Sequence, residues 1–116
     1  MTIAIGMSEY LMKNADKFIE QIRGKYDINF IINDNCINLN GYSNEVIYMK
    51  DIENNSFDIF IDTDLKKCED VYYHKKGKVP CYLLQTDENR RFRSKVINRC
   101  YSWDDFAKEI KYLDKK

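Results

Sequence analysis

The sequence predicts a single three-layer α/β domain, spanning residues 1–116, with a mostly parallel sheet of about five strands between helices. Short apolar runs recur along the chain and are typical of strands buried on both faces. Helical stretches separate most of these runs, and this alternation implies parallel strands joined by right-handed crossovers. The chain has 116 residues, 44% of them hydrophobic, which is enough for the core of one domain.

The first half of the chain begins with a strand and an amphipathic helix. Thr2–Gly6 is an apolar run that ends in a glycine. Ser8 can cap the helix that follows, whose apolar residues recur every three or four positions up to a stop at Gly24. A second buried strand is expected at Ile28–Ile32. The polar, asparagine-rich segment Asn33–Asn44 then predicts a loop.

The second half adds more strands and two helices. The helix expected at Leu65–Lys76 is ended by Gly77. Ser102 is a cap for the last helix, Trp103–Leu113, because acidic residues follow it in the first turn. The remaining expected elements are strands at 45–49, 57–62 and 79–85, a short helix or turn at 50–55, and a candidate sixth strand at 98–101.

Charge and hydropathy exclude several classes of protein. Nineteen basic residues balance nineteen acidic ones, so the chain as a whole has no field that attracts polyanions, although a local basic patch stays open. No apolar run approaches the roughly 20 residues of a membrane span. The first residues carry no basic segment followed by an apolar one, so we expect no signal peptide and a cytoplasmic location.

The cysteines predict free thiols in a reducing compartment. Cys36, Cys68, Cys81 and Cys100 are far apart in the sequence and form no CxxC pair. The single histidine, His74, has no partner at a spacing typical of zinc sites. We therefore expect four buried or half-buried free thiols, with a disulfide only if the protein is secreted.

Ligands of a parallel sheet bind at the carboxyl ends of its strands, so the residues after each strand are the first candidates for a site. These strand exits are Gly6–Ser8, Asn33–Asn35, Lys50, Asp62–Asp64 and Gln85–Arg91.

Motifs at these exits resemble the haloacid dehalogenase-like (HAD) superfamily, in particular its small 5'-nucleotidase and deoxyribonucleotidase branch. The likeness is carried by the segments IAIGMSEYL, IIND, YMKDIENNSFDIFIDTD, GKVPCYLLQTDENRRF and NRCYSWDDF. It spans nearly the whole chain and is most specific from Phe57 to Phe106. The resemblance implies a Rossmann-like, HAD-like fold. No segment is long enough for the cap domain that usually selects HAD substrates.

The resemblance also implies a damaged catalytic centre. In that family an aspartate after the first strand attacks the phosphoryl group, and a second aspartate two residues later moves the proton. Gly6 and Ser8 stand at these two positions here. Asn33 replaces a hydroxyl residue that binds phosphate, and Thr63 replaces a late acidic residue.

The expected function is therefore that of a non-catalytic binder of a phosphorylated small molecule or of a protein partner. No cofactor is expected. The residues that the resemblance offers for a phosphate or other ligand are Gly6, Ser8, Asn33, Lys50, Asn89 and Arg90.

Two alternatives stay open. The first is an atypical phosphatase in which Asp62 and Asp64 hold Mg²⁺ beside Lys50. The second is a small interaction module or inhibitor from a mobile element, with an oligomeric state that the sequence leaves undefined.

Each candidate residue also has a simpler interpretation. Lys50 can be a surface lysine at a helix start, and Asp62 can be a helix cap. Asn89 and Arg90 can contact a phosphate or loop backbone, and their simpler interpretation is a solvated turn. The basic residues from Arg90 to Arg99, interleaved with aromatic ones, can form a nucleic-acid patch. The zero net charge argues against that patch, so we expect no nucleic-acid partner.

Overall fold

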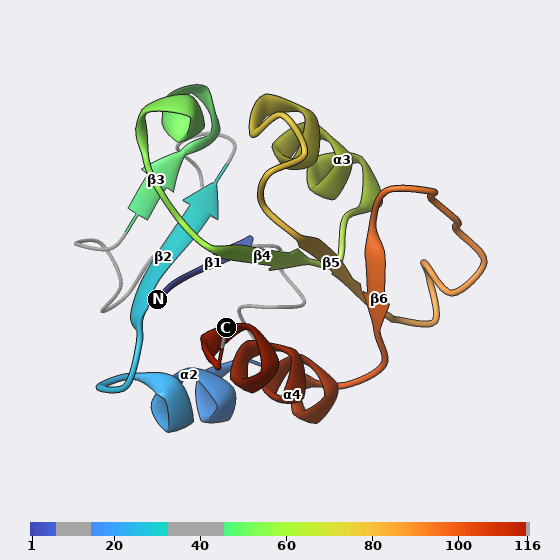
Figure 1. Cartoon of the computed structure of the whole chain (residues 1–116). Helices are drawn as coiled ribbons and strands as arrows, with labels where there is room; N and C mark the ends of the chain where they lie inside the picture. Colours follow the sequence, from blue (N-terminus) through green and yellow to red (C-terminus); the bar gives the residue numbers. More distant parts are fainter. Residues whose placement is uncertain (7–14, 33–45, 116) are drawn as a thin grey trace.

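The computed structural model describes residues 1–6, 15–32 and 46–115. Its centre is a six-stranded sheet in which every neighbouring pair is parallel, in the order β3-β2-β1-β4-β5-β6 (Figure 1). The predicted three-layer α/β class is confirmed. The sheet has six strands because the candidate last strand does pair with β5. The strands are β1 (Thr2–Gly6), β2 (Asp27–Ile32), β3 (Val46–Tyr48), β4 (Ile59–Asp62), β5 (Cys81–Leu84) and β6 (Asn98–Cys100).

The described helices cover both faces of the sheet. α2 (Asp16–Ile22) and α4 (Trp103–Asp114) lie on one face, and the 3₁₀ helix η2 (Met49–Asn54) and α3 (Leu65–His74) lie on the other (Figure 1). Two cores result, one on each side of the sheet. In the described ranges, no helix has the length and apolar character needed to cross a membrane.

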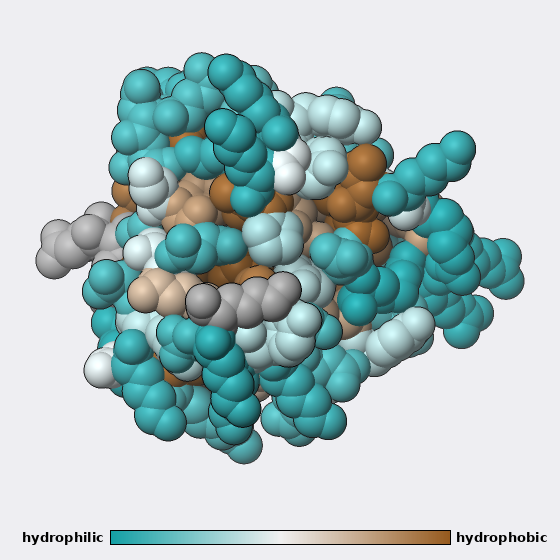
Figure 2. Space-filling view, in the orientation of Figure 1, coloured by the Kyte–Doolittle hydropathy of each residue, from teal (hydrophilic) through white to brown (hydrophobic). Residues whose placement is uncertain are grey.

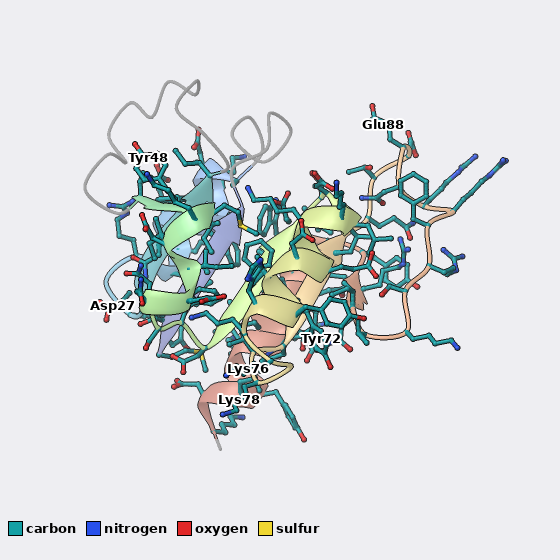
Figure 3. All side chains as sticks on the ribbon, turned by 90° about the horizontal axis from the view of Figure 1, so that it is seen from above. Asp27, Tyr48, Tyr72, Lys76, Lys78 and Glu88 are labelled. Atoms are coloured by element: carbon teal, nitrogen blue, oxygen red, sulfur yellow. The ribbon has the colours of Figure 1, made fainter. Side chains whose placement is uncertain are left out.

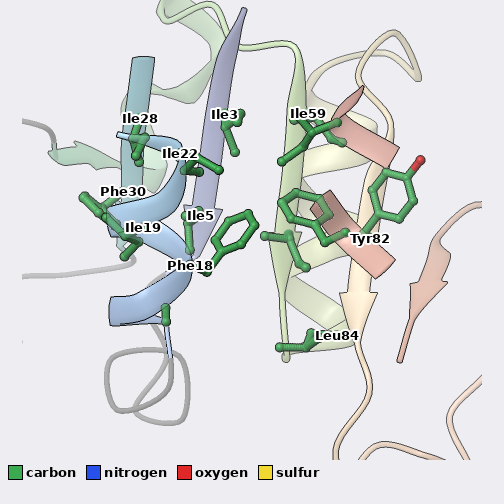
Figure 4. Packing of buried hydrophobic residues seen from close by; sticks show 14 of the residues in the cluster. Ile3, Ile5, Phe18, Ile19, Ile22, Ile28, Phe30, Ile59, Tyr82 and Leu84 are labelled. Carbon is green, nitrogen blue, oxygen red and sulfur yellow. The ribbon is translucent and has the colours of Figure 1, made fainter. Parts of the chain in front are cut away.

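Alternation along each strand divides its side chains between the two cores. Ile3 and Ile5 of β1 belong to the core under α2 and α4, whereas Ala4 belongs to the core under α3. Both faces are buried, which explains why the strands are continuous apolar runs in the sequence. Figure 4 shows Phe18 of α2 and Phe30 of β2 within the first core.

Aromatic rings connect the two helices of this face. Phe106 is fully buried on α4, and its ring centroid lies 5.7 Å from those of Phe18 and Tyr82. Trp103 stacks on Phe18 at 4.6 Å. These ring contacts join α2 to α4 and connect α4 to Tyr82 of β5, and we call them the aromatic seal.

Helix ends follow their local chemistry. Ser102 caps α4 as predicted, since its hydroxyl accepts a hydrogen bond from the Asp105 amide at 3.2 Å. The helix after β4 ends at His74, two residues earlier than expected. The amide of Gly77, whose φ is +72°, bonds back to the Tyr72 carbonyl at 2.9 Å and closes the turn. The predicted cap Ser8 lies outside the described residues.

The strand order reverses between β1 and β4. From β1 the chain moves outward through β2 and β3, and then crosses to β4, β5 and β6 on the other side. This switch point is where ligands bind in open α/β sheets. The carboxyl ends of the described strands all point to one side of the molecule, which we call the carboxyl edge of the sheet, and Tyr48 and Glu88 lie there (Figure 3). Lys76 and Lys78 lie on the opposite side.

Replacement of Phe106 tests the aromatic seal. Phe106→Ala should lower the free energy of unfolding by about 3–5 kcal/mol, because it empties a fully buried position. Lys108→Ala, on the exposed side of the same helix, should change it by less than about 0.5 kcal/mol. Urea denaturation measures both values, and equal losses in the two variants would contradict the packing.

Candidate functional site

Gly6 and Asp62 end the two strands that flank the switch point, and they touch. An added Cβ on Gly6 would lie 1.9 Å from Oδ2 of Asp62 and 2.4 Å from its Cγ. The Asp62 carboxylate therefore occupies the space that a side chain at position 6 would need. No residue other than glycine fits there while Asp62 keeps its position.

The Asp62 carboxylate is fully buried and held from two sides. Its Oδ1 accepts hydrogen bonds from the backbone amides of Thr63 at 2.6 Å and Asp64 at 3.2 Å. Its Oδ2 lies 3.4 Å from the ammonium of Lys67, which is only 6% exposed. The same ammonium donates a 2.8 Å hydrogen bond to the carbonyl of Ile31 in β2. A buried ion pair thus joins α3 to the ends of three strands.

Burial dominates the electrostatics of Asp62. Loss of water raises the pKa of this carboxyl above its ordinary value of 3.8, while the Lys67 charge and the two backbone amides pull the pKa downward. The lysine therefore offsets part of the desolvation penalty. This is a different environment from that of a solvated metal-binding carboxylate.

Asp64 performs the capping that was one interpretation of Asp62. It is the N-cap of α3, and its Oδ1 accepts a 3.3 Å hydrogen bond from the Lys67 amide. The interpretation of Asp62 as the helix cap is therefore wrong. Asp62 is the last residue of β4 and precedes the N-cap position of α3 by two residues.

Asn89 is a buried cross-link between the ends of β4 and β5. Its side-chain amide donates to the carbonyls of Thr63 at 2.9 Å and Leu84 at 3.0 Å. Its Oδ1 accepts from the Thr86 amide at 2.8 Å. Contact with backbone was one of the two roles expected for this side chain. Its burial, at 3% exposed, shows that the simpler interpretation as a solvated turn is wrong. The neighbouring Arg90 is exposed.

The remaining residues expected to bind a ligand either make no described contact with Gly6 or Asp62 or lie outside the described residues. Lys50 is an exposed residue of η2, with its ammonium 5.9 Å from the centroid of the Tyr48 ring. Ser8 and Asn33 lie outside the described residues. The structure thus brings Gly6, Asp62 and Asp64 together, with Asn89 bonded to Thr63 between the two aspartates.

Sequence reasoning missed Lys67. The segment LKKC looks like the solvated start of a helix, and the expected lysine of the site was Lys50. A helical register could have found it, because Lys67 lies four residues before the buried Val71, on the same side of α3.

The described residues do not fit a magnesium site. Asp62 is fully buried, and the cation beside its Oδ2 is already Lys67. Asp64 caps a helix, and Gly6 supplies no carboxylate. Among the described parts of the chain, no cluster of three histidine, cysteine or acidic residues could hold a metal ion.

The described cysteines are free and buried, as predicted for these three. Burial raises the pKa of Cys81 and of Cys100 to about 12, and it raises the pKa of Cys68 well above its ordinary value of 9.0. Thiols with such pKa values stay protonated near neutral pH and are poor nucleophiles. Cys36 lies outside the described residues. His74 is an exposed helix residue, 3.1 Å from Glu53.

Comparison with known proteins gives no assignment. No protein-family model matches the chain, and a search of the curated proteins found no match. The resemblance to the HAD superfamily therefore stays a prediction from the residues.

Gly6→Ala tests the contact at the switch point. The added methyl group meets Asp62, which can move only by leaving Lys67, so the free energy of unfolding should fall by about 1–3 kcal/mol. Asp62→Ala removes the clashing oxygen. A double-mutant cycle by urea denaturation should therefore give a coupling of about 1 kcal/mol or more. Additive effects would show that the two residues do not interfere.

The pH dependence of stability tests the ion pair. A raised pKa means that folded Asp62 holds its proton above pH 3.8, where the unfolded carboxyl has lost it, so stability falls as pH rises through the folded pKa. Lys67→Met removes a group that lowers this pKa. The decline should then extend to higher pH, and the loss near pH 7 should reach about 3–5 kcal/mol.

Unfolding between pH 4 and pH 8 measures this effect, with Lys66→Met at the exposed neighbouring position as the control. In the Asp62→Asn background the same Lys67 substitution should lose its pH dependence. A pH-independent loss in the background with Asp62 intact would contradict the assignment.

Proposed function

We propose that this chain is a non-catalytic HAD-like protein that binds a phosphorylated small molecule at the carboxyl edge of its sheet. The single observation that carries the proposal is the contact of Asp62 with Gly6. In the family that the sequence resembles, position 6 would hold the attacking carboxylate. Here the space for that side chain is filled by a carboxylate from β4.

Burial argues against the atypical phosphatase. A carboxylate that binds Mg²⁺ or activates water must reach the ligand, but Asp62 has no exposed surface. Its two oxygens face backbone amides and Lys67. Asp64 is exposed, but its Oδ1 accepts the hydrogen bond that caps α3, and no second described carboxylate faces it across an open site.

Positive charge at the same edge supports an anionic ligand. Lys50 follows β3 and Arg90 follows β5, and both are exposed. Both therefore belong to the strand ends at which α/β sheets bind ligands. A phosphate group needs such positive charge for binding, and without a nucleophile or metal the bound ester would stay intact.

A thermal-shift screen tests the proposal. Nucleoside monophosphates, sugar phosphates and orthophosphate are added with and without Mg²⁺. A ligand at 100 times its dissociation constant stabilises the fold by about 2.7 kcal/mol. We expect a shift that does not require Mg²⁺ and that Lys50→Gln weakens, whereas Lys78→Gln at the opposite edge leaves it unchanged.

A phosphatase assay with para-nitrophenyl phosphate and Mg²⁺ completes the test, and we expect no turnover. Turnover that Asp62→Asn abolishes would replace the proposal by the hydrolase. No shift with any phosphorylated compound would also overturn it, and would favour the interaction module, to be pursued with a pull-down.

A further inference from the structure

The loop between β5 and β6 concentrates positive charge. Residues 90–99 read RRFRSKVINR, with five basic residues and no acidic one, although the whole chain is neutral. Arg90, Arg91, Arg93 and Lys95 are exposed. Hydrophilic side chains project from this side of the molecule, at the right of Figure 2, where Figure 1 places the orange loop. The neutral total therefore hides a local field.

Two guanidinium groups, one from Arg93 in this loop and one from Arg99 in β6, converge on one atom. Nη1 of Arg93 donates to the carbonyl oxygen of Phe92 at 2.9 Å, and Nη2 of Arg99 donates to the same oxygen. Arg93 also donates to the Arg90 carbonyl at 2.7 Å, and Arg99 to the Gln85 side-chain oxygen at 3.0 Å. The three acceptor atoms are all neutral, so two positive charges are held close together without a described carboxylate partner.

Such a pair is a preorganised site for a phosphate. Guanidinium groups bind phosphate oxygens through parallel N–H donors. Here the hydrogen bonds to carbonyl oxygens already restrict both arginine side chains, so less conformational entropy is lost when an anion binds. An arriving anion also relieves the repulsion between the two like charges. The hydroxyl of Ser94 donates a hydrogen bond to the Glu69 carboxylate of α3 at 3.4 Å.

A hollow beside the pair has room for a base. A cavity of about 300 Å³ is lined by Arg93, Arg99 and Tyr101, together with the apolar side chains of Leu65 and Ile97. Tyr101 is 67% exposed, and Phe92 at the loop tip is 52% exposed. Trp103, by contrast, packs on Phe18 in the core and takes no part in this surface.

We propose that this surface binds single-stranded nucleic acid. A phosphate of the strand binds between Arg93 and Arg99, and an unpaired base stacks on Tyr101 beside the apolar wall of the hollow. Exposed aromatic rings among arginines are the combination that single strands use, since every base has a face that can stack. An acidic peptide would use the charges but has no need of the rings.

The number of cations also favours a strand over a single nucleotide. One phosphate is satisfied by the Arg93–Arg99 pair, and Arg90, Arg91 and Lys95 are left for neighbouring phosphates. The proposal shares Arg90 with the function proposed above but uses neither the Gly6–Asp62 contact nor Lys50, so its test with variants of Arg93, Arg99 and Tyr101 is separate from that of the proposed function.

Fluorescence anisotropy with labelled twelve-residue oligo-dT and oligo-U tests the proposal at 50 mM salt. We expect binding of at least one of them, with an affinity that falls as salt rises. The double variant Arg93→Gln with Arg99→Gln should weaken oligonucleotide binding at least about tenfold. It should also make the slope of log affinity against log salt concentration less steep by about one. Tyr101→Ala should weaken it at least about fivefold without changing that slope.

Lys76→Gln with Lys78→Gln is the matched control, because it removes the same charge at the opposite edge of the sheet (Figure 3). Circular dichroism checks that each variant is folded. If the double arginine variant does not fold, Arg93→Gln alone serves, since that side chain is exposed.

Several results would overturn the proposal. The first two are a lack of binding to either oligonucleotide and an equal loss of affinity in the control lysine variant. The third is duplex DNA that binds as tightly as the single strand. The fourth is an oligoglutamate of equal charge that displaces the labelled strand as effectively as unlabelled oligonucleotide does. Preference for the DNA or for the RNA strand supports it either way and identifies the natural strand.

Discussion

The buried carboxylate of Asp62 rests directly on the backbone of Gly6, and the geometry of the switch point depends on this contact. A charge without water must be compensated within the protein. Lys67 compensates it from α3, while backbone amides after β4 bind the other oxygen. Because Lys67 also donates to Ile31, the same ammonium ties α3 to β2. One interaction therefore positions one helix and the ends of three adjacent strands.

The same contact decides which chemistry is open to the site. A catalytic carboxylate needs access to its substrate, whereas Asp62 is sealed and already neutralised by a lysine. Its protonation state then affects folding stability more than reactivity. On the proposed function, such a centre keeps the shape of a phosphate-binding fold without catalysing a reaction, and exposed cations near the strand ends would bind the ligand.

The fold was predictable because its information is local and periodic. Runs such as Thr2–Gly6 are buried on both faces, so they stand out as continuous apolar segments, and Ser102 caps α4 as its neighbours indicate. For the candidate site, only its location at the carboxyl ends of the strands was predictable. Gly6 and Asp62 are 56 residues apart, and nothing in either segment shows that one fills the space of the other. Lys67 was hidden because a lysine pair is usually solvated, while the expected Lys50 stays on the surface.

The arginine loop shows the same limit for charge. Net charge is a sum over the chain. A sum of zero is compatible with five cations in residues 90–99, since the balancing carboxylates lie elsewhere in the sequence. Sequence spacing places Arg93 and Arg99 six residues apart, yet only the folded loop brings both guanidinium groups to the carbonyl of Phe92. Like charges held together by neutral acceptors are stabilised by an anion. Because β5 and β6 fix both ends of this loop, a ligand would find the pair already assembled, whatever happens at the switch point.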